Sequence, residues 1–201
     1  MYFMQNHNVI LEGSVEKNIF LKPLLDEHFQ YLHKWYNDHE VLYWCEGDDI
    51  DKWEINALKS MYTHVSKNAF CFIIEFENIF IGDCWLQKMN IEEVLNLYKG
   101  LDIRRIDLAI GEKNYWNKGI GTEVMKILIQ FAFNSEKIDC LYCMPYDYNT
   151  RSCRMLEKCG FELVRTKELP DGMKGKYEMH YLLTKEKYEE IIRNIITMRT
   201  K

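Results

Sequence analysis

The segment from Asp107 to Thr122 holds the residues best suited to bind and act on a ligand. Gly119 and Gly121 stand just before a predicted helix, where unpaired backbone N–H groups and the helix dipole attract phosphate. Glycine has no Cβ, so the backbone can approach a ligand closely there. Lys118 adds a positive charge, and the Thr122 hydroxyl adds a donor. The spacing matches neither GxxxxGK nor GxGxxG, so the alternative is a tight turn that packs a helix on a strand.

Asp107 is a carboxylate inside the predicted strand 105–110. Alternation along the strand places the larger apolar side chains on one face: Ile106, Leu108 and Ile110. The other face carries Asp107 and two small neighbours that leave space beside it: Ala109 and Gly111. A carboxylate in such a position suits a cationic amine by simple pairing. The alternative is a structural ion pair with Arg104 or Arg105.

The elements that must position this segment alternate between strand and helix along the chain. Strands are predicted at residues 18–22, 69–76, 79–86, 105–110, 139–144, 161–166 and 176–183. Helices are predicted to begin at Asp26, Asp51, Thr122, Asn149 and Thr184, and residues 90–100 form a short helix or a loop. Hairpins combined with strand–helix alternation indicate an α/β fold, in which one mixed, mostly antiparallel sheet has helices on both faces.

The composition excludes several classes of function. The net charge of -5 disfavours a nucleic-acid partner, which needs a basic face. No apolar run reaches the length of a membrane span, and the N-terminus has no signal-peptide pattern. The seven cysteines are predicted to be reduced and buried, with Cys140 and Cys143 on opposite faces of a strand. The six histidines show no metal-binding spacing. We therefore expect a cytoplasmic protein with no metal, no membrane and no nucleic acid.

Two landmarks resemble the GNAT superfamily of N-acetyltransferases. The family's diphosphate loop has Gln or Arg, two residues, Gly, one residue, then Gly or Ala; here Gly119 and Gly121 match, and Trp116 replaces the first residue. Downstream, Asn149 leads a predicted helix that ends in Gly160-Phe161, like the family's second landmark. The resemblance implies one acetyltransferase domain over residues 1–201, with a core at about 18–184, an extra helix at about 185–198 and a sheet that splays at the acetyl-CoA site.

The resemblance also implies which residues bind acetyl-CoA, the expected co-substrate. The pantetheine would bond main-chain groups of residues 108–110, and the diphosphate would bind the glycine loop. The full set is Leu108, Ala109, Ile110, Asn117, Lys118, Gly119, Ile120, Gly121, Thr122 and Asn149. The family often supplies a tyrosine as general acid, but that position is Leu156 here. Tyr146, Tyr148 or water would have to replace it.

Within the superfamily, the stretch around Asp107 looks most like aminoglycoside 6'-N-acetyltransferases, in which the corresponding Asp holds or deprotonates the amine. Met144 departs from those enzymes, which often have an acidic residue there. The acceptor is then a small cationic amine, with predicted contacts from Trp44, Glu46, Asp48, Asp49 and Asp107, and further candidates in Glu92 and Glu93. Alternatives are a Rim-type protein N-terminal acetyltransferase, a hydroxylysine acetyltransferase of siderophore synthesis, and a non-catalytic acyl-CoA-binding module.

The predicted C-terminal helix has a one-sided apolar stripe beyond the usual end of the family's domain. Its members recur at steps of three and four residues: Tyr188, Ile191, Ile192, Ile195 and Ile196. Such a stripe needs a partner surface. It packs either on its own domain or on a second chain, so both a monomer and a homodimer are open.

Overall fold

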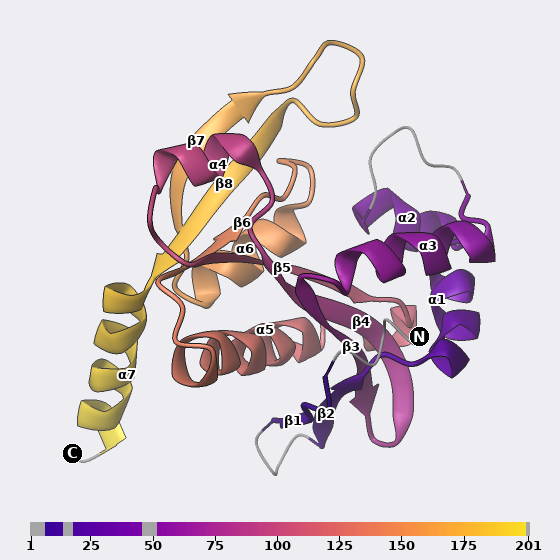
Figure 1. Cartoon of the computed structure of the whole chain (residues 1–201), viewed down its shortest axis with the longest axis horizontal. Helices are drawn as coiled ribbons and strands as arrows, with labels where there is room; N and C mark the ends of the chain where they lie inside the picture. Colours follow the sequence, from indigo (N-terminus) through magenta and orange to yellow (C-terminus); the bar gives the residue numbers. More distant parts are fainter. Residues whose placement is uncertain (1–6, 14–17, 46–51, 200–201) are drawn as a thin grey trace.

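The computed structural model describes residues 7–13, 18–45 and 52–199, which build one eight-stranded mixed sheet (Figure 1). The strand order is β1-β2-β3-β4-β5-β6-β8-β7. β5 and β6 run parallel, and each other neighbouring pair runs antiparallel. The strands are β1 Leu11–Glu12, β2 Ile19–Pro23, β3 Ala69–Phe76, β4 Ile79–Lys88, β5 Ile103–Ile110, β6 Cys140–Cys143, β7 Glu162–Glu168 and β8 Tyr177–Thr184.

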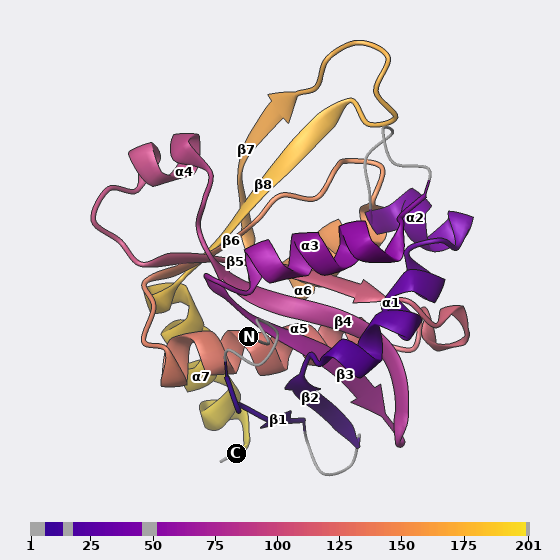
Figure 2. The same ribbon diagram turned by 45° about the vertical axis from the view of Figure 1, so that its right-hand side comes forward.

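Helices cover both faces of the sheet, as predicted (Figure 1 and Figure 2). One layer holds α1 Phe29–Trp35, α2 His39–Cys45 and α3 Ile55–Val65, and the other holds α5 Ile120–Gln130, its π-helical extension Phe131–Ser135 and α6 Thr150–Lys158. Neighbouring strand residues alternate between the layers: Phe72 and Ile74 pack with α5, while Cys71 and Ile73 pack with α1 and α3. A smaller core lies under α4, Glu92–Leu97.

The sheet forks between its two parallel strands. β5 has eight residues, but only Ile103, Arg104 and Arg105 pair with β6, opposite Cys140, Leu141 and Tyr142. Beyond this point β5 stays paired to β4, and β6 stays paired to β8, so the two halves of the sheet diverge. The predicted splay is therefore confirmed, and it leaves one edge of β5 open along Ile106–Ile110.

Two predictions for the N-terminal helices are wrong. Leu25, and not Asp26, takes the N-cap position, and the chain first makes a 3-10 turn at Asp26–His28 before α1. The sequence prediction also missed α2. Asp38 starts α2, because its Oδ1 accepts the N–H groups of Glu40 at 2.9 Å and Val41 at 3.4 Å. The predicted cap at Asp51 lies outside the described residues.

The C-terminal helix α7, Lys185–Arg199, packs on the rest of the chain through its first half. The Tyr188 ring stacks on Phe133 with centroids 4.7 Å apart, and Asn134 donates to its hydroxyl at 2.9 Å. Ile195 and Ile196, further along the stripe, remain exposed. Self-packing therefore accounts for the beginning of the stripe and leaves its end uncovered.

The cysteines follow the prediction except in burial, because Cys45 is exposed and Cys153 is half-buried. Each of the seven is a free thiol. Cys140 packs under α4 and Cys143 packs in the α5 core, so the two side chains leave β6 on opposite faces.

Candidate active site

The fork opens into a cavity of about 930 Å³ that gathers most of the predicted site residues. Eleven of them line it: Trp44, Asp107, Leu108, Ala109, Ile110, Asn117, Gly119, Ile120, Gly121, Thr122 and Asn149. Lys118 does not line it, and its ammonium lies 5.5 Å from the centroid of the Tyr115 ring. The predicted contacts Glu46, Asp48 and Asp49 lie outside the described residues.

The N-terminus of α5 presents backbone donors to this cavity. Gly119 is the N-cap residue, in the left-handed conformation at φ 78°, and Asn117 is also left-handed at φ 60°. Within the described part of the chain no side chain caps this helix. The first N–H groups of α5 therefore have neither an intrahelical acceptor nor a capping acceptor, an arrangement that fits an anionic diphosphate.

Gly121 serves a different purpose from Gly119. A Cβ there would make ordinary contacts, 3.5 Å from Met155 Sδ and 3.6 Å from Leu108 Cδ2. Leu108 is on β5 and Met155 on α6, so the glycine lets the first turn of α5 lie close to both walls of the fork. Anything larger than a methyl group would enter the space between them.

Trp116, the departure from the family's loop pattern, closes part of the open edge of β5. Its Nε1–H donates to the Ile110 carbonyl at 2.6 Å. Its ring also stacks with Arg151, whose guanidinium carbon lies 4.9 Å from the Trp116 centroid and 4.6 Å from that of Trp44. One arginine thus joins the glycine loop to α2 across the cavity.

Helix α6 contributes basic residues that the sequence prediction missed. Arg151, Arg154 and Lys158 all line the cavity. Their spacing of three and four residues places them on one face of the helix, a signal that was readable in the sequence. Their charge complements the phosphate groups that the neighbouring α5 terminus would hold.

Asn149, predicted as a cofactor contact, positions two helices. Its Oδ1 accepts the Ser152 N–H at 3.1 Å and so caps α6. Its Nδ2 donates to the Trp44 carbonyl at 2.8 Å, which ties the end of α2 to the start of α6. Trp44 therefore lies at the cavity because α6 holds it there.

Asp107 lines the cavity with its carboxylate already engaged. Arg105 donates to it twice, from Nε at 2.8 Å and from Nη2 at 2.7 Å. The structural alternative to a catalytic Asp107 is thus present in the molecule, and it involves Arg105 rather than Arg104. Arg104 instead makes a bidentate pair with Asp102, at 2.8 and 3.0 Å.

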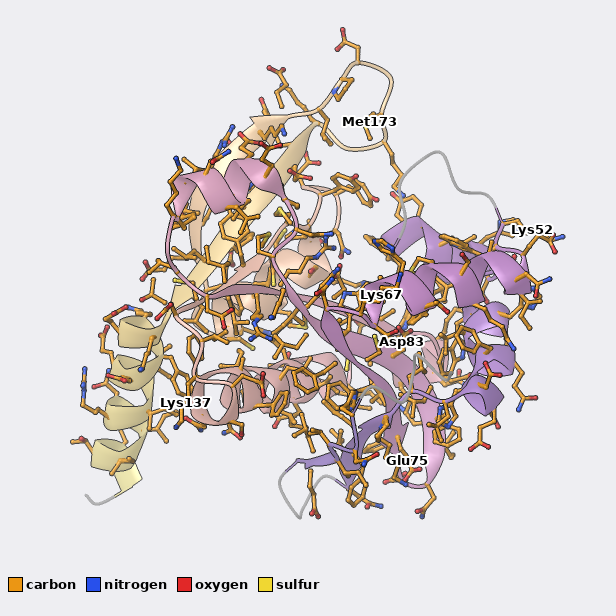
Figure 3. The ribbon with its side chains drawn as sticks, in the orientation of Figure 1. Lys52, Lys67, Glu75, Asp83, Lys137 and Met173 are labelled. Carbon is orange, nitrogen blue, oxygen red and sulfur yellow. The ribbon has the colours of Figure 1, made fainter. Side chains whose placement is uncertain are left out.

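Asp83 is a second carboxylate in the cavity lining, and the sequence prediction did not single it out. It lies on β4 beneath α3 (Figure 3) and is 1% exposed. Tyr62 donates to it at 2.5 Å and Tyr36 at 3.2 Å. Burial and the Asp83 carboxylate raise the pKa of Tyr62 well above its ordinary value. A charged residue inside an otherwise apolar strand was the signal for this position.

One further expectation is wrong. Glu92 and Glu93 do not line the cavity. Glu93 pairs with Arg165 at 2.5 Å and with Lys167 at 3.1 Å, so it fastens α4 to β7. Leu156 is 1% exposed, and it brings no proton donor to the place where the family often has one.

Comparison with known protein families shows which family this chain belongs to. The model of the acetyltransferase (GNAT) domain matches residues 18–162. The chain belongs to the GNAT acetyltransferase family. As a member of that family, the protein is an N-acetyltransferase that uses acetyl-CoA, which agrees with a forked sheet beside an uncapped helix terminus.

Several named relatives and solved structures are similar to this chain. The chain is 21% identical to aminoglycoside N(6')-acetyltransferase type 1 of Klebsiella pneumoniae over 159 residues, which cover 77% of this chain and 79% of the relative. The solved structure of aminoglycoside acetyltransferase AAC(6')-Ib with coenzyme A has a TM-score of 0.73 and 19% identity, covering 86% and 98% of the two chains. Mycobacterium smegmatis RimJ, solved with CoA-disulfide, has a TM-score of 0.71 and 13% identity, covering 89% and 88%.

The described residues form neither a helix that could span a membrane nor a cluster that could hold a metal ion. None of the helices described there is both long enough and apolar enough to span a bilayer. The same part of the chain contains no cluster of three or more His, Cys, Asp or Glu residues arranged to hold a metal ion.

Proposed function

We propose that the acetyl acceptor is a primary amine of a cationic small molecule, such as an aminoglycoside antibiotic. The observation that carries this proposal is the pair of carboxylates in the cavity. Asp83 pairs with Ala109, and Trp85 pairs with Asp107, so the two aspartates share one face of neighbouring strands. Diagonal neighbours of this kind have Cα atoms about 7–8 Å apart. Two neighbouring carboxylates on one face suit an acceptor with more than one ammonium group, and the similarity to an aminoglycoside acetyltransferase supports the same choice.

In this proposal Asp107 is the catalytic residue that holds the reacting amine. Its ion pair with Arg105 orients the carboxylate, and the side chain is 32% exposed. Trp44 forms the opposite wall, and Glu46, Asp48 and Asp49 follow it in the chain as proposed acceptor contacts. Aromatic faces beside carboxylates bind ammonium groups through cation–π attraction as well as charge.

The proposed acetyl-CoA contacts divide along the fork. Residues 117–122 would hold the diphosphate, and the basic face of α6 would flank it. The Ala109 carbonyl faces Gly82 of β4, since a Cβ at Gly82 would lie 2.1 Å from that oxygen. Main-chain groups alternate in direction along a strand, so those of Leu108 and Ile110 face the fork and are the proposed pantetheine contacts. The Ile110 carbonyl already accepts a hydrogen bond from Trp116 Nε1.

A thiol-release screen tests the acceptor class. The purified protein is mixed with acetyl-CoA and, separately, with aminoglycosides, polyamines and N-terminal peptides, and free CoA thiol is measured. We expect turnover with aminoglycosides or polyamines and none with peptides. Turnover confined to peptides would favour the Rim-type alternative. Tight acetyl-CoA binding without thiol release from any mixture would favour a non-catalytic binding module.

A further inference from the structure

The acceptor face of the fork carries a buried polar chain that the roles above leave unused. Tyr142 on β6 pairs in register with Arg105, at the last position before the strands diverge. Its hydroxyl lies 2.8 Å from Nδ1 of His180 on β8, and His180 Nε2 lies 2.9 Å from Oε1 of Glu178. The contact between His180 Nε2 and Glu178 Oε1 has the distance of an ion pair but not the geometry of an aligned hydrogen bond. Tyr142 and Glu178 line the cavity, and His180 does not.

The protonation of His180 follows from these contacts. A carboxylate accepts and cannot donate, so the nitrogen that faces Glu178 carries the ring proton. Nδ1 is then unprotonated, and it accepts from the Tyr142 hydroxyl. Both rings are 1–2% exposed. Burial lowers the pKa of His180 below its ordinary value, against the opposing charge of Glu178, so the ring is neutral at pH 7.

The charged groups that act on His180 are Glu178 on β8, Arg165 on β7 and Glu93 on α4. Tyr142 on β6 contacts the ring directly, and Arg105 on β5 acts on Glu178. Tyr98 of α4 covers the Tyr142 ring with centroids 5.9 Å apart. A proton that arrives on the ring would make an imidazolium beside Glu178, which converts their contact into a charged pair in a buried setting.

The acetyl-transfer reaction needs such a proton acceptor. An alkyl ammonium has a pKa of about 10 and cannot attack a carbonyl until it loses a proton. Asp107 is held by two hydrogen bonds from Arg105, and Leu156 supplies no titratable group. Tyr142 can take part in such a transfer, because it lines the cavity and its hydroxyl is hydrogen-bonded to the neutral His180 ring.

We propose that Tyr142 and His180 form the proton relay for this reaction, with Glu178 stabilising the protonated ring. The inference rests on the proposed function. The ammonium passes one proton to Tyr142 Oη as the Tyr142 proton moves to His180 Nδ1. Acetyl-CoA supplies an activated carbonyl: the C–N bond forms, the C–S bond breaks, and a second nitrogen proton goes to sulfur to give CoA thiol. After the product leaves, His180 Nδ1 returns its proton to Tyr142 Oη as that hydroxyl releases its own proton to solvent in the cavity, so both side chains regain their starting states. Tyr142 is the catalytic member, and His180 and Glu178 are positioning residues.

The test is the pH dependence of kcat/KM for Tyr142→Phe, with kanamycin or whichever amine the screen ranks first. Without the relay, only amine that is already neutral in solution can react. We expect kcat/KM to fall about 100-fold at pH 7. The deficit should then narrow roughly tenfold per pH unit as the pH rises toward the amine pKa of about 10. His180→Asn should show the same narrowing, and acetyl-CoA affinity measured by calorimetry should not change.

Tyr181→Phe is the matched control. It removes a hydroxyl of a buried tyrosine on β8 that donates to Glu157 at 2.9 Å, outside the cavity lining. It should lose a similar amount of thermal stability and keep wild-type kcat/KM at each pH. A Tyr142→Phe deficit that is absent, or that stays constant with pH, overturns the relay while the acceptor assignment stands. Wild-type protein that acetylates no amine contradicts the proposed function and the relay together.

Discussion

Replacing Asp107 with Asn separates a catalytic carboxylate from a structural one. The substitution removes the negative charge and breaks two hydrogen bonds from Arg105, at 2.8 and 2.7 Å. Both side chains are partly exposed, so the pair contributes about 1–2 kcal/mol to folding. For a chain of this length each kcal/mol lowers the melting temperature by about 2–4 °C. We therefore expect Asp107→Asn to lower it by roughly 2–8 °C.

The chain contains a closely matched control at the start of the same strand, where Asp102 immediately precedes β5. Asp102 accepts two hydrogen bonds from Arg104, at 2.8 and 3.0 Å, with the same two-residue spacing, and neither residue lines the cavity. Asp102→Asn should therefore cost a similar melting-temperature decrease. Turnover should fall only in Asp107→Asn, by about 100-fold, which corresponds to ~2.7 kcal/mol of transition-state stabilisation. Acetyl-CoA affinity should stay unchanged in both variants.

The assay measures thiol release per folded molecule at a temperature well below both melting transitions. If Asp107→Asn and Asp102→Asn lose the same stability and both retain near-wild-type turnover, Asp107 is only the partner of Arg105. That result would remove it from the proposed catalytic residues and leave Asp83 as the acceptor's main carboxylate.

Three other changes test the glycine loop, the last helix and the buried His28. Gly121→Val places methyl groups beyond the Cβ position that lies 3.5 Å from Met155, so calorimetry should show at least a tenfold loss of acetyl-CoA affinity, about 1.4 kcal/mol. Unchanged affinity would contradict the role of this loop. Tyr188→Ala removes the stack on Phe133 and should cost about 2–4 kcal/mol in denaturant unfolding, whereas no change would mean that α7 does not stabilise the domain. Burial lowers the pKa of His28 in the folded chain, so the unfolded chain takes up protons first as the pH falls below about 6.5. Stability should then decrease by up to ~1.4 kcal/mol per pH unit, and His28→Gln should flatten that decrease in melting curves between pH 7.5 and 5.5.

Local chemistry made much of this site predictable. Gly119 and Gly121 precede a helix whose apolar period is clear, and a carboxylate at 107 interrupts an alternating strand. These signals depend on residues close together in the chain, where geometry is set by strand and helix periods alone. Asn149 was instead predicted from the resemblance to the family, and its observed contacts are a cap of α6 and a hydrogen bond to Trp44.

Other members of the site depended on contacts between distant segments. Asp83 lies beside Asp107 only because β4 and β5 pair in one register, in which a shift by one residue would turn Asp83 to the other face. Tyr142 and His180 are 38 residues apart, and they meet because β8 inserts between β6 and β7. No local pattern marks such a partnership, since each residue alone reads as an ordinary strand residue.

The sequence by itself therefore determined the class of fold and the helix terminus that faces the cavity, because periodicity and glycine placement act over a few residues, and its resemblance to GNAT enzymes indicated the family. The tertiary structure decided which charges oppose one another. It joined Asp107 to Arg105, buried Asp83 under two tyrosines and fastened Glu93 to β7 instead of the cavity. Those outcomes follow from strand order and from the point at which β5 leaves β6. Both are set by packing across the whole sheet, so a single stretch of chain does not contain them.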